Sequence, residues 1–413
     1  MDISKITFKY QQNTIDKAIK YFENSKVSYP KFNIFYKMGL GKTITSLGIA
    51  AKLQPKTILI VCPKSLIDMW VYNFNKFITG YMRISEAKAV NNYTTNIVVF
   101  TNYESLLSLT QPIFPDLCIF DEVHKIKNIN GKIHKNINRY IMPNRTLCLT
   151  GTPIVKDLMD LFGILTCVGE QTFGHLNASQ FKYKYVINGG VRSTAQLKQI
   201  IEPFTVDIDY EGLVDMPDTE DIIIPVPISV KQQFELEDIY SSNKNALVRI
   251  TEAIQVTSGI PDSPKVKLCE SLIDDIVADN QKVVLFVRLD KEFEYFTNKY
   301  KDICASINGK TKDRETQVQE FQSNPKIKLF IGNIQTAGVG LTLTAAHKCI
   351  FFSETYSWGD LTQAMSRIYR IGQEHSCSYY HLLCLGTIDE FIYKNIQMKN
   401  NLIEEFKKCY GGD

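Results

Sequence analysis

The sequence lacks the features of a secreted, zinc-stabilised or membrane-embedded protein. Its ten cysteines stand singly, with no CxxC pair and no cysteine–histidine cluster at the spacing of a zinc site. Neither a disulfide framework nor structural zinc is therefore expected, and reduced thiols are the simpler interpretation. No apolar segment follows the N-terminal MDISKITFKYQQ, and the longest apolar runs have the length of a strand rather than of a membrane span. These absences predict a cytoplasmic chain with no signal peptide and no membrane partner.

The chain also lacks a strong net charge. At +3, the formal charge is too small to indicate a nucleic-acid-binding protein by itself. If nucleic acid is a partner, it has to be held locally, in a groove lined by backbone amides and a few lysines or arginines. Hydrophobic residues make up 44% and charged residues 22%, which is ordinary for a globular protein. At about 150 residues per domain, the length predicts two or three domains, each with its own core.

Short apolar runs alternate with longer segments of helical spacing in both halves of the sequence. The runs are too short for helices and rich in Ile, Val, Leu and Phe, which is typical of strands buried on both faces. They cover residues 32–36, 57–62, 96–100, 116–120 and 145–149, and then 282–287, 328–331, 348–352 and 379–384. Strand–helix alternation that occurs twice predicts an α/β fold with two parallel-sheet lobes.

The alternation breaks between the two halves. Residues 160–265 have mostly helical spacing, interrupted by Gly189-Gly190 and by the proline-containing stretch 216–227. We therefore predict a first lobe at 1–165, a helical insertion with the inter-lobe linker at 166–264, and a second lobe at 265–413 that ends in a C-terminal brace helix.

The strongest single pattern is MGLGKT, directly after an expected strand and directly before an expected helix. Glycine lets several backbone N–H groups approach a phosphate closely, and the N-terminus of the following helix adds a partial positive charge. Lys42 would reach the β- and γ-phosphates, and the Thr43 hydroxyl would bind Mg²⁺. Tyr36 replaces the first glycine of the usual pattern, and the alternative interpretation is a glycine-rich turn. The expected nucleotide-binding residues here are Met38, Gly39, Leu40, Gly41, Lys42 and Thr43.

A pair of carboxylates follows the expected strand at 116–120. The sequence DEVH begins at Asp121, so both acids lie at the C-terminal end of a parallel strand, where such sheets bind ligands. Asp121 would hold Mg²⁺, and Glu122 would orient or deprotonate the attacking water. The alternative is an acidic loop that caps the next helix, which is less attractive after a phosphate loop.

The sequence LTGTP follows the next expected strand. The two hydroxyls and the glycine of Thr150, Gly151 and Thr152 suit a linker that senses the γ-phosphate and reports to the nucleic-acid groove. In another context these residues would be a turn that ends a strand. We assign them a coupling role.

The second half carries the sequence QAMSRIYRIGQ from Gln363 to Gln373. Arg367 and Arg370 are three residues apart, so a helix would place them on one face. An arginine supplied across a cleft can neutralise the charge of the transferred phosphoryl group, an effect of about a thousand-fold or more in rate. The alternative is a solvated basic helix face.

These four patterns occur in the order of motifs I, II, III and VI of helicase superfamily two, which they resemble. The ending RIYRIGQ and the later GTIDE at residues 386–390 are similar to the Swi/Snf-type (sucrose-non-fermenting) family of DNA-dependent ATPases. The resemblance implies two RecA-like lobes that bind ATP with Mg²⁺ between them. It also implies movement along duplex DNA without full strand separation.

The resemblance implies roles for further residues along the chain. Gln11 corresponds to the adenine reader, and Gly340 and Gln363 belong to the nucleotide-binding motifs of the second lobe. Trp70 belongs to the motif that starts at Cys62. Contacts to the nucleic-acid backbone are implied for Lys64, Ser65, Asn102, Asn308, Gly309, Thr336 and Trp358. Each has a simpler alternative: Lys64 as a solvated side chain, Ser65 as a helix cap and Trp358 as a core residue.

The sequence departs from the family pattern at three places. Tyr36 and Lys37 stand where acidic residues usually precede MGLGKT, and Val155-Lys156 replaces a Gln-Asn pair. The arginine-rich stretch before the second lobe is replaced by residues 206–209, with the sequence VDID. Family contacts made at these places are therefore in doubt.

Three functions remain open from the sequence. The first is an ATP-dependent translocase on duplex DNA, acting in replication, repair or recombination as a monomeric motor, with a recruiting protein as a further partner. The second is a helicase that separates or anneals strands at forks. The third is a non-catalytic clamp gated by ATP, against which the full set of catalytic residues argues. Compactness and composition favour a bacterial or virus-infected cell as the setting.

Overall fold

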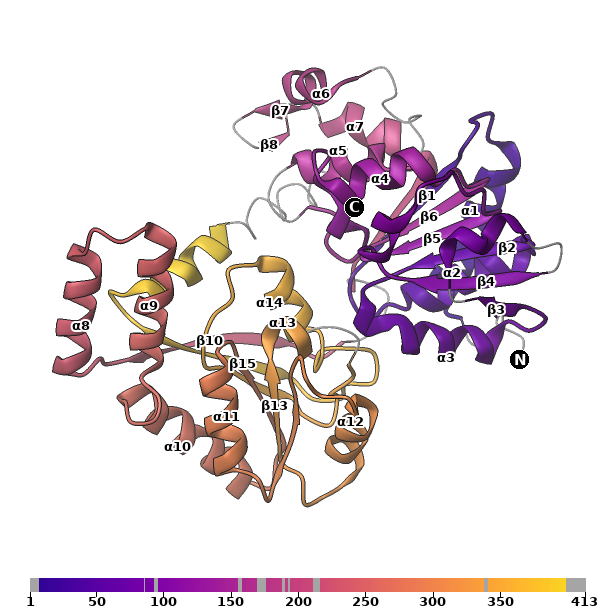
Figure 1. Cartoon of the computed structure of the whole chain (residues 1–413). Coiled ribbons are helices and arrows are strands. Elements are labelled where there is room, and N and C mark those ends of the chain that lie inside the picture. Colours follow the sequence, from indigo (N-terminus) through magenta and orange to yellow (C-terminus); the bar gives the residue numbers. More distant parts are fainter. Residues whose placement is uncertain are drawn as a thin grey trace. The chain divides into compact units, whose positions relative to one another are not determined.

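The computed structural model describes residues 7–84, 86–92, 96–154, 158–168, 176–187, 190–191, 194–210, 216–337 and 341–398. The chain forms two compact units, residues 1–213 with 401–413, and residues 214–400. Each unit is built around one parallel sheet with helices packed beside it, as Figure 1 shows. The predicted α/β fold with two parallel-sheet lobes is confirmed.

The first unit contains a seven-stranded sheet in the order β3-β4-β2-β5-β6-β1-β9. All its neighbouring strands run parallel. The strands are β1 (Lys31–Tyr36), β2 (Thr57–Val61), β3 (Met82–Ile84), β4 (Ile97–Thr101), β5 (Leu117–Asp121), β6 (Arg145–Leu149) and β9 (Thr205–Ile208). The helices are α1 (Lys9–Asn24), α2 (Lys42–Leu53), α3 (Ile67–Phe77), α4 (Lys132–Tyr140), α5 (Leu158–Thr166), α6 (Ala178–Tyr185) and α7 (Thr194–Ile201). A small antiparallel hairpin joins β7 (Val186–Ile187) to β8 (Gly190–Val191).

The second unit contains a six-stranded sheet in the order β10-β15-β14-β11-β13-β12, again with parallel neighbours throughout. The strands are β10 (Thr219–Val226), β11 (Val283–Val287), β12 (Cys304–Ile307), β13 (Leu329–Asn333), β14 (Lys348–Phe351) and β15 (Cys377–Cys384). The helices are α8 (Val230–Ser241), α9 (Ala246–Ser258), α10 (Pro264–Ala278), α11 (Asp290–Lys299), α12 (Arg314–Ser323), α13 (Ile334–Ala337) and α14 (Trp358–Met365). A further helix occupies residues 388–398, in the part of the sequence where we expected a brace helix.

The central strands are buried on both faces, which explains why they appear in the sequence as continuous apolar runs. Along β11, Val284 and Phe286 belong to one core cluster, whereas Val283, Leu285 and Val287 belong to another. Successive side chains of a strand point to opposite faces, so the two clusters lie on the two sides of the sheet. Helices pack over both clusters and complete the layers.

Six strands of the described residues were missing from the sequence interpretation: β3, β7, β8, β9, β10 and β12. β9 and β10 lie inside the segment 166–264, where we expected a helical insertion. β9 adds the last strand to the first sheet by pairing with β1, and β10 pairs with β15 in the second. The segment is thus divided between the two units, and it contains helices α6 to α9, the β7–β8 hairpin and these two edge strands.

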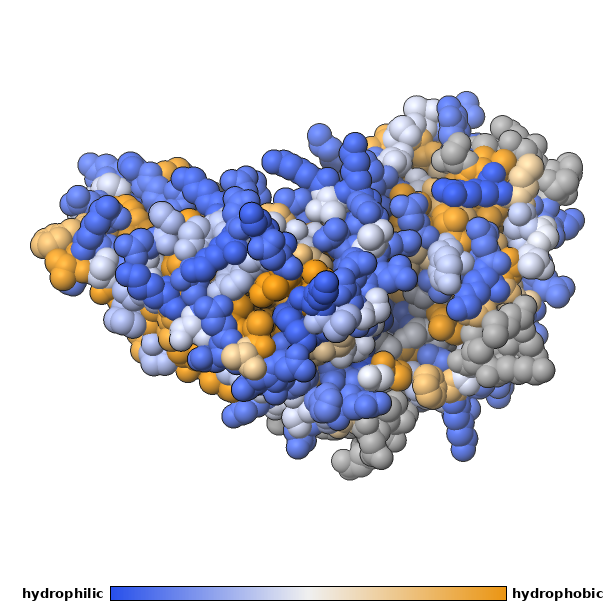
Figure 2. All heavy atoms as spheres, turned by 90° about the horizontal axis from the view of Figure 1, so that it is seen from below, coloured by the Kyte–Doolittle hydropathy of each residue, from blue (hydrophilic) through white to orange (hydrophobic). Residues whose placement is uncertain are grey.

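Polar residues dominate the face of the molecule that Figure 2 draws. In the face drawn in Figure 2, hydrophilic side chains cover most of the surface and apolar residues gather in smaller groups. Within the described residues, no helix is both long and apolar enough to cross a membrane.

Candidate nucleotide-binding site

The phosphate loop connects β1 to α2 in the first unit. Gly39 and Gly41 have φ angles of 84° and 79°, in the left-handed region that side chains strongly disfavour. A Cβ atom at Gly41 would also lie 2.2 Å from the Nε2 of Gln11. The loop therefore needs glycine at this position for its backbone conformation and for its packing. The loop leads directly into the N-terminus of α2, where the free N–H groups of the helix favour binding of an anion.

Lys42 lies between the phosphate loop and the predicted coupling loop. Its Nζ donates to the backbone O of Tyr36 at 3.2 Å. A Cβ atom built on Gly151 would lie 3.3 Å from this Nζ and 3.0 Å from the Cγ of Met38. Gly151 thus allows the loop after β6 to approach the phosphate loop closely. The structure brings together the two segments that we predicted to bind and to sense the phosphate.

Gln11 is fastened to the phosphate loop. Its Nε2 donates to the backbone O of Leu40 at 2.9 Å, and its Oε1 accepts the N–H of Phe8 at 2.9 Å. The Tyr10 hydroxyl donates to the same Leu40 carbonyl at 2.9 Å. The first turn of α1 is therefore bound to the phosphate loop through the Leu40 carbonyl. The role of Gln11 in recognising adenine stays a prediction.

Asp121 is the last residue of β5, and three donors fix its position. The indole N–H of Trp70 donates to its Oδ2 at 2.8 Å, and the N–H of Glu122 donates to its Oδ1 at 3.0 Å. The Tyr103 hydroxyl donates to its main-chain O at 2.6 Å. Burial and then the charge of Glu122 raise the pKa of Asp121 to about 6, while Trp70 and Lys42 act in the opposite direction.

The role of Trp70 was missed in the sequence. The residue is fully buried in α3 and meets the acid pair through a contact 51 positions away along the chain. A buried indole N–H needs a hydrogen-bond acceptor, so a buried tryptophan indicates that a polar group lies nearby. The identity of that group could not be read from the sequence.

Glu122 begins a chain of polar contacts that ends in the coupling loop. Its φ of 53° is unusual for a residue with a side chain. Its Oε2 lies 3.3 Å from the Nδ1 of His124, which lies 3.0 Å from the Thr150 hydroxyl oxygen. That oxygen also accepts the N–H of Thr152 at 3.1 Å. Glu122 and the predicted coupling residues therefore share one connected network.

The oxygen ligands expected for Mg²⁺ fit this site. Mg²⁺ prefers oxygen ligands and usually binds through one or two protein groups together with substrate phosphates and water. Asp121 offers a buried carboxylate whose two oxygens accept hydrogen bonds from Trp70 and from the N–H of Glu122, and further lone pairs remain for a metal. Thr43 lies in the first turn of α2 and carries the second expected ligand, a hydroxyl.

The two arginines predicted to act in catalysis, Arg367 and Arg370, lie near each other in the second unit, but not on a helix. α14 ends at Met365, and Arg367 and Arg370 occupy the turns that follow, so the predicted helix face was wrong. The N–H of Arg367 donates to the O of Ala364 at 3.0 Å, three residues back, which tightens and ends the helix. Both guanidinium groups donate to the backbone O of Leu341, at 3.0 Å and 2.9 Å.

The other nucleotide-binding candidates of the second unit differ in how far the structure describes them. Gln363 is buried in α14, and its backbone O accepts the Nε–H of Arg367 at 2.9 Å. Gly340 lies outside the described residues. Thr336 lies within the short helix α13.

The candidate nucleic-acid contacts mostly follow strand ends. In the first unit, Lys64 and Ser65 are exposed in a short turn after β2, and Asn102 follows β4 and accepts the N–H of Ser105 at 2.9 Å. In the second unit, Asn308 and Gly309 follow β12. Carboxyl ends of parallel strands meet at one edge of a sheet, so each set lies along one edge of its own unit.

Trp358 occupies a different environment. It is the first residue of α14, is half-buried, and packs against a core cluster of the second unit. This packing favours the simpler alternative of a core residue over a nucleic-acid contact. The more exposed aromatic side chain nearby is Tyr356, with the guanidinium of Arg288 at 3.7 Å from its ring centroid.

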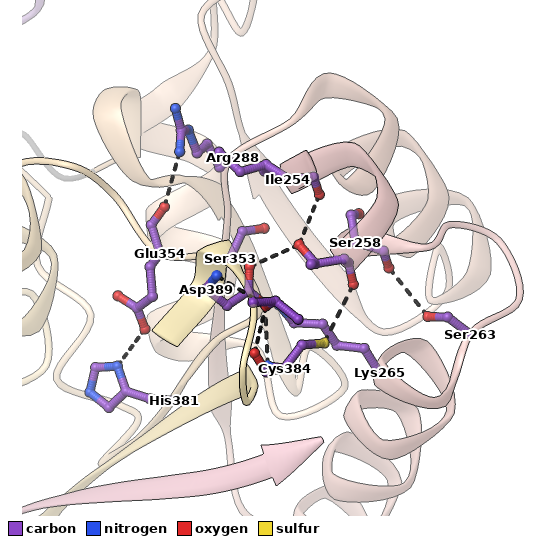
Figure 3. Close-up of polar contacts among 12 residues, drawn as sticks. Ile254, Ser258, Ser263, Lys265, Arg288, Ser353, Glu354, His381, Cys384 and Asp389 are labelled. Carbon is purple, nitrogen blue, oxygen red and sulfur yellow. Dashed lines mark hydrogen bonds and ion pairs between the residues drawn. The ribbon is translucent and has the colours of Figure 1, made fainter. Parts of the chain in front are cut away.

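The GTIDE sequence supplies a buried ion pair, shown in Figure 3. Asp389 Oδ2 lies 2.5 Å from the Nζ of Lys265, at the start of α10. Its Oδ1 accepts the hydroxyl of Thr257 at 2.8 Å, and its Oδ2 accepts the N–H of Cys384 at 3.3 Å. Asp389 thus joins α9, α10 and β15 in the interior of the second unit.

Two family models match the chain. The SNF2-related domain matches residues 34–260, and the helicase conserved C-terminal domain matches residues 264–372. This pair of domains defines the class of DNA-dependent ATPases in helicase superfamily two. The chain belongs to the SNF2-related family, as its motifs indicated.

Individual relatives are distant. The chain is 23% identical to the chromodomain-helicase-DNA-binding protein 1-like of Mus musculus, over 89% of this chain and 47% of that protein. It is 26% identical to the DNA repair and recombination protein RDH54 of Saccharomyces cerevisiae, over 89% of this chain and 48% of that protein. The chain thus spans about half the length of these relatives. It also resembles the solved Sulfolobus solfataricus SWI2/SNF2 ATPase core in complex with dsDNA, at 22% identity and a TM-score of 0.47, over 97% of this chain and 96% of that one.

Proposed function

We propose that the chain binds ATP and Mg²⁺ at the phosphate loop of its first unit and uses hydrolysis to move along duplex DNA. The observation that carries the proposal is the cluster formed by the phosphate loop, the acid pair and the coupling loop. In this cluster Lys42 lies beside Gly151, and Glu122 is linked through His124 to Thr150. Family membership supports DNA as the track.

The residues of the cluster have separate tasks in this proposal. Backbone N–H groups of the loop and the Lys42 ammonium hold the β- and γ-phosphates. When bound, Mg²⁺ would supply positive charge that neutralises the charge developing on the phosphates. Asp121 and Thr43 would hold it. Glu122 orients the attacking water and takes its proton, and its position beside His124 couples this step to the coupling loop.

We propose that Arg367 and Arg370 stabilise the transition state of ATP hydrolysis. Both guanidinium groups converge on the Leu341 carbonyl, so they act from one place in the second unit. An arginine that reaches the γ-phosphate only when the two lobes close makes hydrolysis depend on closure. The predicted backbone contacts of Lys64, Ser65, Asn102, Asn308, Gly309 and Thr336 would hold the track through phosphates, because a motor has to tolerate every base sequence.

Displacement of a third strand from a DNA triplex tests the movement directly. A translocase advancing along the duplex releases the third strand in an ATP-dependent reaction, while the Glu122→Gln variant releases none. A forked duplex serves as the parallel substrate, and the proposal expects it to stay paired. Triplex release without fork opening supports the translocase, and ATP-dependent fork opening would instead establish the helicase.

The non-catalytic clamp predicts a third pattern. It would bind ATP and DNA together but release neither a third strand nor inorganic phosphate. The setting in replication, repair or recombination is likewise a proposal, and the relative named for DNA repair and recombination supports it.

A further inference from the structure

Residues 205–210 lie beside the phosphate loop, although none of the nucleotide-binding motifs includes them. β9 pairs in parallel with β1, and the register brings Ile208 opposite Tyr36. Tyr36 is the last residue of β1, so the chain after β9 runs past the start of the phosphate loop. The N–H of Lys37 continues the pairing by donating to the O of Ile208 at 2.9 Å.

Two side chains of this segment hold the first residues of the loop. Asp209 Oδ2 forms an ion pair with the Nζ of Lys37 at 3.2 Å. The hydroxyl of Tyr210 donates to the backbone O of Met38, and the Lys37 Nζ lies 5.9 Å from the Tyr210 ring centroid.

The hydrogen bond from Tyr210 to the Met38 carbonyl fixes the orientation of a backbone N–H that can bind a phosphate. The C=O of Met38 and the N–H of Gly39 belong to one planar trans peptide and therefore point in opposite directions. A donor that holds this carbonyl on one side directs the Gly39 N–H to the other. The Leu40 carbonyl is held in the same way by Tyr10 and Gln11, which directs the N–H of Gly41.

We propose that Tyr210 is a positioning residue for the phosphate loop, and that the Lys37–Asp209 ion pair holds the segment in which it lies. By holding the Met38 carbonyl, Tyr210 orients the Gly39 N–H toward a nucleotide phosphate before the nucleotide arrives. Loss of the hydroxyl removes this hydrogen bond from the Met38 carbonyl, so a larger part of the binding free energy is spent on ordering the peptide. The inference rests on the proposed function, because it requires that the loop binds nucleotide phosphates.

Tyr210→Phe tests the inference in the full chain without DNA. We expect the Kd for fluorescently labelled ADP to rise about three- to tenfold, as for the loss of one hydrogen bond, with an unchanged Kd for DNA. Tyr81→Phe is the matched control, because the Tyr81 hydroxyl donates to the backbone O of Pro55 in the same unit. It removes an equivalent tyrosine–carbonyl bond and leaves the Kd for ADP unchanged.

Charge exchange tests the ion pair separately. Lys37→Asp and Asp209→Lys each weaken ADP binding by about two- to threefold, as expected for a partly exposed pair, and the double variant recovers affinity. The control exchange uses Lys52 and Asp16, an exposed pair at 2.6 Å in the same unit, and leaves binding unchanged.

The outcomes separate the inference from the proposed function. If Tyr210→Phe binds ADP as tightly as the unmodified chain, or if Tyr81→Phe weakens binding equally, the positioning role is wrong. If the unmodified chain and Lys42→Ala bind ADP with equal affinity, the loop is not the nucleotide site and the proposed function itself fails.

Discussion

Replacing Lys265 by methionine removes one half of the buried ion pair of the second unit. The Lys265 and Asp389 side chains are 2% and 7% exposed and lie 2.5 Å apart. Burial would lower the pKa of Lys265, but the charge of Asp389 raises it above the ordinary value. The lysine is therefore charged in the folded protein, beside Asp389 (Figure 3). Its removal leaves the Asp389 carboxylate buried beside Thr257 without its cation.

The expected loss of stability follows from this burial. Breaking a buried pair by removing one partner costs about 3–5 kcal/mol in the free energy of unfolding. With a urea dependence of about 2–3 kcal/mol per molar, the unfolding midpoint of the second unit falls by about 1–2.5 M. Adding Asp389→Asn removes the unpaired charge but keeps an acceptor for Thr257. We expect the double variant to regain about 2 kcal/mol relative to Lys265→Met.

The two tryptophans make the assay specific to each unit. The chain contains only Trp70 and Trp358, one in each unit. In a Trp70→Phe background, tryptophan fluorescence during urea unfolding reports the second unit, and in a Trp358→Phe background it reports the first. A midpoint change below about 0.3 M in the second unit would refute the argument, because it would correspond to less than about 1 kcal/mol. An equal change in both backgrounds would refute its assignment to one unit.

Further predictions concern catalysis, stability and salt. Glu122→Gln should bind ATP but lose turnover by at least about a hundredfold, as removal of a general base does, measured by nucleotide binding beside phosphate release. Arg370→Ala should keep ATP affinity while kcat falls by about a thousandfold, and a loss of affinity at normal kcat would assign the residue to binding. Burial lowers the pKa of His381, but the charge of Glu354, 2.6 Å away, outweighs burial and raises it from 6.5 to about 9. Because the folded pKa is the higher one, this stabilisation is complete below pH 6.5 and is lost as pH rises through about 9. The urea midpoint of the second unit should therefore fall between pH 7 and pH 10, and His381→Gln should remove that part of the dependence. DNA-stimulated turnover should weaken steeply as salt rises, since backbone phosphate contacts release counterions, and insensitivity to salt would contradict the proposed groove.

The sequence predicted the central strands well and the edge strands poorly. β2 and β11 are buried on both faces, and all their residues except Thr57 are apolar. β10 lies at the edge of its sheet, is largely exposed, and contains acidic residues and Pro225, which the pattern of buried strands does not include. Its residues therefore resembled a linker.

The candidate site was predictable where function lies within one short segment. The phosphate loop and the acid pair each combine a strand end with reactive side chains, and that combination is visible in the sequence. Contacts between distant segments were not predictable, such as those of Trp70 with Asp121 and of Tyr210 with Met38. The end of α14 at Met365 was also missed, because no glycine or proline marks it before Gly372.

The central claim is that duplex DNA, the proposed track, stimulates ATP hydrolysis by this chain. Steady-state ATP hydrolysis tests it with no nucleic acid, single-stranded DNA, duplex DNA and duplex RNA, each beside Lys42→Ala. We expect slow turnover without nucleic acid, strong stimulation by duplex DNA only, and no turnover with Lys42→Ala. Equal or greater stimulation by single strands or RNA would contradict the duplex track, and absence of turnover under every condition would contradict the motor.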